Sequence, residues 1–104
     1  MANTFGTDIL IQAPDPRAAA EFYVKQLSFS ITAEKPMLEL KGPRITLYIE
    51  QGSKLGPVLE VTVKDVAEAK ARLVKAGCKV VKDEPEFPRV YVQDPNGLIY
   101  NLTT

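Results

Sequence analysis

The sequence predicts an α+β fold made of two tandem βαβββ modules, and three observations support this class. The stretch DILIQAPDPRAAAEFYVKQLSF at residues 8–29 has a counterpart fifty residues later, VLEVTVKDVAEAKARLVKAGCK at residues 58–79. In both stretches about six residues alternate between two faces, as a half-buried strand requires. In both, an Asp then opens a segment with apolar residues at helical spacing. Similarity at a fixed period indicates that one supersecondary unit has been duplicated.

Both helices carry start signals. Asp15 and Asp65 are expected to cap them by accepting hydrogen bonds from the first turn, with Pro16 at the first helical position and Glu68 completing a capping box. Gly77 is expected to end the second helix. The predicted apolar faces comprise Pro16, Ala19, Phe22 and Tyr23 in the first helix and Val66, Ala69, Leu73 and Ala76 in the second. We expect Phe22 and Tyr23 to anchor the first helix to the core.

Three further strands are predicted after each helix. In the first half they span residues 29–33, 37–41 and 44–50, and in the second half residues 78–82, 88–93 and 98–103. Pro and Gly residues separate them, most clearly in the Asp-Pro-Asn-Gly turn at 94–97. Residues 51–57 resemble a linker. The chain is therefore expected to form a single domain, residues 1–104, with modules at 7–51 and 57–104.

Alternation along the strands separates an apolar face from a polar face. The residues predicted to pack under the helices are Ile9, Ile11, Ala13, Ile45, Leu47, Ile49, Leu59, Val61, Val63, Val90 and Val92. The residues predicted on the opposite face are Asp8, Leu10, Gln12, Arg44, Thr46, Tyr48, Glu50, Val58, Glu60, Thr62, Arg89, Tyr91, Gln93 and Asn101. One face is thus expected to be covered by helices, and the other to be polar and charged.

Composition excludes several classes of function. Thirteen basic residues balance thirteen acidic ones, so no nucleic-acid or anionic-membrane partner is predicted, and no apolar run is long enough to span a bilayer. Cys78 is the single cysteine, and no export signal is evident, which predicts a cytoplasmic protein. The chain has no histidine, which removes the commonest general base and the commonest transition-metal ligand.

Two motifs carry a family resemblance. The run of Asp-Pro, helix, Phe-Tyr and Leu-x-Phe at residues 15–29 and the Asp-Pro-Asn-Gly turn together resemble the glyoxalase, bleomycin-resistance and extradiol-dioxygenase superfamily, also called vicinal oxygen chelate proteins. The resemblance covers nearly the whole chain, with Ser28 standing where the family usually has Gly. It implies a curved, incompletely closed mixed sheet with helices on its outer face and a cavity at its centre.

The resemblance also implies positions for metal ligands. Metal-using members place His, Glu or Gln on the first and last strands of each module, and these positions correspond here to Asp8, Tyr48, Val58 and Asn101. A divalent transition metal needs three or four nitrogen, sulfur or carboxylate donors, whereas this set offers one carboxylate. We therefore predict no metal and no other cofactor. A hard cation such as Mg²⁺ or Ca²⁺ between Asp8 and Glu60 stays open as an alternative.

The resulting prediction is a metal-free homodimer that binds a small polar organic ligand in the concave cavity between the modules. The predicted ligand-binding residues are Asp8, Arg44, Tyr48, Glu60, Arg89, Tyr91 and Asn101. Two other classes of function stay open. One is a metal-independent isomerase or lyase, with Asp8 or Glu60 as base and Tyr48 or Tyr91 as acid. The other is a non-catalytic dimeric interaction protein. No catalytic residue is assigned, and the ligand is not identified.

Overall fold

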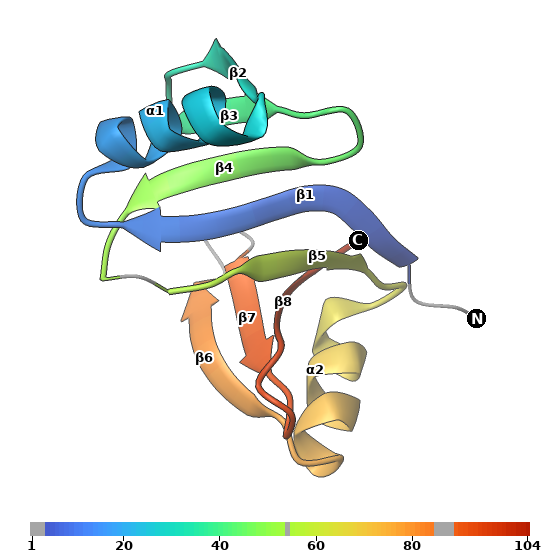
Figure 1. Cartoon of the computed structure of the whole chain (residues 1–104). Coiled ribbons are helices and arrows are strands. Elements are labelled where there is room, and N and C mark those ends of the chain that lie inside the picture. The colour runs from blue at the N-terminus through green and yellow to red at the C-terminus, as the bar shows by residue number, and fades with distance from the viewer. Residues whose placement is uncertain (1–3, 54, 85–88) are drawn as a thin grey trace. The chain divides into compact units, whose positions relative to one another are not determined.

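The structure divides into two compact units. A computed structural model describes residues 4–53, 55–84 and 89–104 (Figure 1). One unit comprises residues 7–57, and the other comprises residues 58–104 together with the N-terminal residues up to Gly6. We call them the first module and the second module. Among the described residues, no helix has the length and apolar character that crossing a membrane would require.

The first module is a βαβββ unit. It contains β1 (Thr4–Ala13), which enters this module at Thr7, followed by α1 (Pro16–Leu27), β2 (Ser30–Ala33), β3 (Leu38–Lys41) and β4 (Thr46–Gln51). Its strands lie in the order β2-β3-β4-β1, with β1 parallel to β4 and the other pairs antiparallel. Figure 1 shows α1 against β3 and β4, on one face of this mixed sheet.

The second module repeats this topology. It contains β5 (Val58–Thr62), α2 (Val66–Lys75), β6 (Lys79–Glu84), β7 (Arg89–Gln93) and β8 (Ile99–Thr103), in the strand order β6-β7-β8-β5. β5 is parallel to β8, and the remaining pairs are antiparallel. The α+β class, the repeated βαβββ unit and the mixed, open sheet are thus confirmed. Pro88, predicted to begin the seventh strand, lies outside the described residues.

Asp15 and Asp65 cap their helices as predicted, whereas the return bond of the capping box at Glu68 stays a prediction. The Asp15 carboxylate accepts a hydrogen bond from the Ala18 N–H at 3.1 Å, and the Asp65 carboxylate accepts one from the Glu68 N–H at 3.0 Å. Gly77, with φ at +111°, follows the end of α2. Ser28 ends α1 with φ at +63°, in the left-handed region that glycine adopts most readily. Glycine would adopt this backbone conformation at lower cost than serine.

The Asp-Pro-Asn-Gly turn is held by one carboxylate. Asp94 Oδ1 accepts hydrogen bonds from the N–H groups of Asn96 and Leu98 at 2.9 and 3.0 Å, and the Tyr100 hydroxyl donates to Oδ2. The bond from Tyr100 is the main reason that the pKa of Asp94 lies below its usual value. Burial, and then the Asp94 carboxylate, raise the pKa of Tyr100 to about 12. Asp94 therefore fixes the turn that leads into β8 and the start of that strand.

Each module has its own apolar core on the helix side of its sheet. In the first module the cluster comprises Ala20, Leu38, Leu40, Leu47 and Ile49, with Ile9, Ile11, Ala13 and Tyr23 packed around it. In the second module it comprises Val61, Val63, Ala69, Cys78, Val90, Val92 and Leu102, with Val66 and Leu73 packed around it. Most of the inward faces predicted from alternation are therefore correct.

Several predicted positions are wrong. Phe22 is 57% exposed and contacts Tyr23 edge to face, so it is no core anchor. The face of α1 that meets the sheet instead passes through Ala20, which has no exposed surface. Ile45 is also exposed, because β4 begins one residue after it. Ala76 is exposed as well, because α2 ends at Lys75.

Candidate functional site

The polar face of the first module carries a hydrogen-bonded group around Glu39. Glu39 on β3 and Tyr48 on β4 are cross-strand partners, and the Tyr48 hydroxyl donates to Glu39 Oε2 at 2.8 Å. The Thr32 hydroxyl donates to Glu39 Oε1 at 2.7 Å. These two bonds, the one from Thr32 first, hold the pKa of Glu39 below its usual value. The hydroxyl proton of Tyr48 is thereby directed towards a protein carboxylate.

Asp8 shares this face with Tyr48. In the parallel pairing of β1 and β4, Leu10 lies beside Tyr48, and Asp8 lies two residues earlier on the same strand. Residues two apart on a strand point to the same face. Arg44 differs from the prediction, because β4 begins only at Thr46 and Arg44 lies exposed in the connection before it. Of the three predicted residues in this module, the sheet thus places Asp8 and Tyr48 on one face.

The polar face of the second module contains a row of four side chains across neighbouring strands. Glu60 on β5 lies beside Asn101 on β8, Asn101 lies opposite Tyr91 on β7, and Tyr91 lies opposite Lys82 on β6. Three of these residues were predicted from the sequence, and Lys82 was missed. A bulge between Val80 and Lys82 changes the alternation of β6, so the strand pattern alone could not place Lys82.

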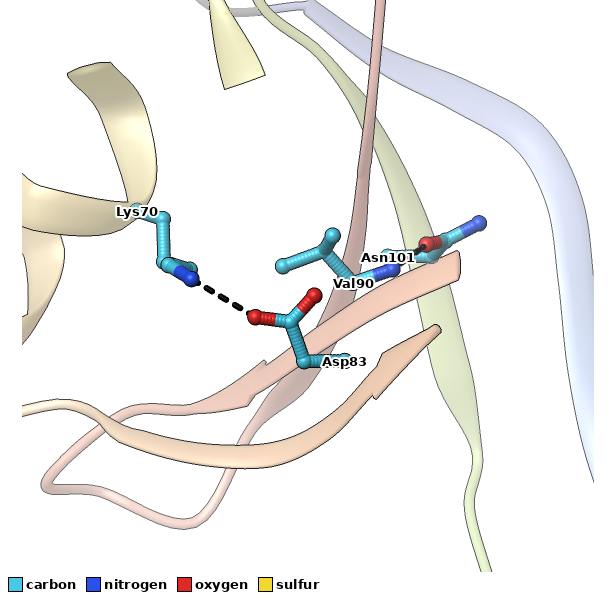
Figure 2. A network of polar contacts seen from close by, with 4 residues as sticks. All are labelled: Lys70, Asp83, Val90 and Asn101. Carbon is cyan, nitrogen blue, oxygen red and sulfur yellow. Dashed lines mark hydrogen bonds and ion pairs between the residues drawn. The ribbon is translucent and has the colours of Figure 1, made fainter. Parts of the chain in front are cut away.

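Asn101 has a defined structural role. Its side-chain oxygen accepts a hydrogen bond from the backbone N–H of Val90 at 3.1 Å, as Figure 2 shows. The pairing of Tyr91 with Asn101 is the last of the β7–β8 ladder at this end. The amide therefore satisfies a backbone donor at the point where the ladder stops, and keeps β7 attached to β8.

Arg89 and Tyr91 are also held in place. The guanidinium of Arg89 lies 5.8 Å from the centre of the Tyr91 ring, a cation–π distance, and its Nη1 lies 3.9 Å from Glu84 Oε1. Tyr91 is only 2% exposed, so its ring is buried in the sheet, and its part in ligand binding stays a prediction. The buried ring forms a platform on which the Arg89 side chain rests.

β1 passes close to the Glu60 side chain at Gly6. A Cβ atom added to Gly6 would lie 2.5 Å from Glu60 Oε1, closer than real contacts allow. Glu60 itself is half-buried on β5. The absence of a side chain at Gly6 therefore leaves the space that the Glu60 carboxylate occupies.

The residues at the metal-ligand positions that the family resemblance implies do not fit a divalent transition metal. The Tyr48 hydroxyl is bonded to Glu39, and the Asn101 oxygen to the Val90 N–H. Val58 is a buried alkyl side chain. Within residues 4–53, 55–84 and 89–104, no three His, Cys, Asp or Glu side chains converge as metal ligands would. Only Asp8 retains a carboxylate at one of these positions. Its pairing with Glu60 around a hard cation stays a prediction.

Comparisons with known proteins agree with the family resemblance found in the sequence. A family model for the glyoxalase-like domain matches residues 8–103. A hypothetical protein from Bacillus halodurans has a similar structure, with a TM-score of 0.68, 14% identity and coverage of 98% of this chain and 94% of that one. A glyoxalase/bleomycin resistance protein/dioxygenase superfamily member from Vibrio splendidus gives a TM-score of 0.65, 17% identity and coverage of 95% and 97%.

A mutant of 4-hydroxymandelate synthase from Streptomyces coelicolor gives a TM-score of 0.62 at 20% identity. The match covers 93% of this chain and 36% of the synthase. At these identities the similarity concerns the fold and does not extend to chemistry. No protein of curated function matches the sequence significantly.

Proposed function

Because the chain belongs to the family of glyoxalase-like domains, we propose that it is a metal-free member that binds a small polar organic ligand. This proposal rests on the side chains at the family's metal-ligand positions, two of which have polar atoms bonded to other groups of the protein. The hydroxyl of Tyr48 and the amide oxygen of Asn101 have protein partners, and Val58 offers no donor atom. A ligand would therefore be held by polar side chains, without a metal to orient it.

The polar sheet faces supply the side chains for this binding. In the second module, Glu60, Asn101 and Tyr91 lie in one row, and Arg89 rests over the Tyr91 ring. A guanidinium pairs with a carboxylate through two parallel hydrogen bonds, so a ligand that carries a carboxylate group fits this arrangement. In the first module, Asp8, Arg44 and Tyr48 are the proposed contacts. The cavity that these residues would share is part of the proposal.

Catalysis is the weaker alternative. An isomerase or lyase would need an acid, and the proton of Tyr48 already points to Glu39, whose lowered pKa keeps it ionised. Tyr48 is therefore suited to accept a hydrogen bond from a ligand more than to protonate one. A non-catalytic interaction protein would show no ligand at all, which the following experiment tests.

We expect carboxylic acids to raise the melting temperature of the purified protein. A screen would compare small carboxylates such as benzoate, phenylacetate and succinate with their uncharged amides. A ligand at ten times its dissociation constant stabilises the folded state by about 1.4 kcal/mol, which corresponds to several degrees in a domain of this size. Arg44→Ala or Arg89→Ala should abolish the shift while the unliganded protein stays folded.

Arg72→Ala is the matched control for these arginines. Arg72 lies on α2 and pairs with Glu68 one turn away, so its loss should leave any ligand shift unchanged. Binding that survives both Arg44→Ala and Arg89→Ala would contradict the assigned contacts. One tightly held ion per chain, found by elemental analysis after exposure to Zn²⁺, Ni²⁺ or Fe²⁺, would contradict the metal-free state and revive glyoxalase-type chemistry.

We also propose that the protein is a cytoplasmic homodimer. This proposal rests on the family and on the sequence features given above. Light scattering at micromolar concentration should give the mass of two chains. The mass of one chain would show that the dimer is wrong and would leave the ligand proposal to stand alone.

A further inference from the structure

The second module contains a cavity on the helix side of its sheet. Its volume is about 520 Å³. The lining residues are Val66, Ala67 and Lys70 from α2, Asp83 from β6, Val90 from β7, and Leu102, Thr103 and Thr104 at the end of the chain. Val90 and Leu102 alternate with Tyr91 and Asn101 along their strands. The cavity therefore lies on the opposite side of this sheet from the polar row proposed above.

One ion pair borders these apolar walls. Lys70 Nζ lies 2.6 Å from Asp83 Oδ2, and both side chains are 36% exposed. Asp83 is the cross-strand neighbour of Val90, so its carboxylate emerges beside the apolar wall. Figure 2 shows Lys70 and Asp83 pointing towards each other, with the Val90 side chain on their side of the strand and the Asn101 side chain on the other. The pair links α2 to the outer strand of the sheet.

The first module has a smaller version of the same feature. This cavity has a volume of about 290 Å³ and is lined by Pro16 of α1 and Ile49 of β4. In the second module, Val66 of α2 and Leu102 of β8 hold the corresponding places in the lining. Pro36 and Met37 also line this smaller cavity. The corresponding ion pair joins Arg17 of α1 to Glu34, with 50% and 59% exposed side chains. The space beside the helix start is thus common to both modules, and its volume is larger in the second.

We propose that the cavity of the second module binds a neutral, mostly apolar organic molecule that carries one hydroxyl or carbonyl group. A volume of about 520 Å³ falls in the range of small-molecule sites, and the Val66, Val90 and Leu102 side chains offer apolar contact. A charged ligand would lose its hydration against the apolar walls and would compete with Lys70 or Asp83 for its partner. A hydroxyl or carbonyl group can instead hydrogen-bond to the intact pair. The proposal is independent of the ligand site on the polar face.

The test compares two probes that differ in charge. At pH 7, 2-naphthol is neutral and 2-naphthoate is an anion, while their ring systems are the same. Isothermal titration calorimetry should show 2-naphthol binding to the wild-type protein at least about tenfold more tightly than 2-naphthoate, because only the anion must lose the hydration of a charge against the apolar walls and compete with the ion pair. Absence of 2-naphthol binding, or equal binding of the two probes, would overturn the proposal.

Two variants locate the site. Ala67 and Ala71 are both exposed alanines of α2, one turn apart, and only Ala67 lines the cavity. Ala67→Phe should weaken 2-naphthol binding by about tenfold or more by filling the cavity, and Ala71→Phe should leave it unchanged. Equal binding to both variants would place the probe elsewhere and overturn the proposal.

Asp83→Asn gives a test that does not depend on the folding of Ala67→Phe. The substitution leaves Lys70 without its carboxylate partner, so 2-naphthoate should now bind about tenfold or more tightly than it does to the wild-type protein. Unchanged binding of 2-naphthoate to Asp83→Asn would show that the ion pair does not select the ligand, and would overturn the proposed ligand class.

Discussion

Tyr23→Ala is expected to lower the free energy of unfolding by about 3 kcal/mol, whereas Phe22→Ala should lower it by less than about 1 kcal/mol. Tyr23 packs against the core cluster of the first module, and its ring meets Phe29 edge to face at 6.2 Å. Phe22 is 57% exposed and loses little buried surface when it is truncated. Urea unfolding followed by circular dichroism measures both values.

The two residues are adjacent on one helix, so each variant is a control for the other. Both changes replace an aromatic residue by Ala in α1, and the gain in helix propensity is similar for the two. A large loss for Phe22→Ala and a small loss for Tyr23→Ala would mean that α1 presents a different face to its sheet. Losses of about 3 kcal/mol for both variants would mean that both rings are anchors, as predicted from the sequence.

The spacing of residues in the sequence already indicated which face of α1 packs against the sheet. Pro16, Ala19, Ala20 and Tyr23 follow the spacing i, i+3, i+4, i+7 of a helix face, and the structure buries this face at least in part. Phe22 lies outside that spacing. The signal for the correct face was therefore present, but the size and hydrophobicity of Phe22 suggested that it was buried. The strand faces were easier to predict because a period of two leaves only two choices.

Cross-strand neighbours could not be predicted in the same way. Glu39, Lys82 and Asp83 are placed by the register between strands, which depends on loops and bulges more than on the composition of one strand. Each module has a bulge in the strand after its helix, between Ile31 and Ala33 and between Val80 and Lys82. The ion pair of Lys70 was missed because of the bulge in β6, whereas the partner of Tyr48 depends on the register of β3 against β4.

Asn101 was interpreted from the sequence as a metal ligand that has been lost. The structure adds a positive role, because its amide oxygen accepts the Val90 N–H where the β7–β8 ladder stops. Alternation correctly placed Asn101 on the polar face, but it could not show which backbone donor the amide would meet. Asn101 thus has a structural role in holding β7 and β8 together.

Asn101→Leu is therefore expected to destabilise the protein by about 1–3 kcal/mol, the range for leaving a part-buried backbone donor without a partner. Leu has a similar size, so loss of the acceptor dominates over loss of packing. Hydrogen exchange followed by NMR should show faster exchange of the Val90 amide, and urea unfolding should show the loss of stability. The effect should be greatest at Val90, because the side-chain bond of Asn101 is made to that amide.

Asn101→Asp separates the hydrogen bond from the rest of the side chain. Asp retains an oxygen that can accept a hydrogen bond from the Val90 N–H. The substitution also places a carboxylate beside that of Glu60, the neighbour of Asn101 in the sheet. Protection of the Val90 amide should therefore persist in Asn101→Asp, while repulsion between the two carboxylates lowers overall stability near neutral pH and less so in acid. If the Val90 amide exchanges equally fast in Asn101→Leu and in the wild-type protein, the side-chain bond of Asn101 contributes nothing to the stability of the ladder.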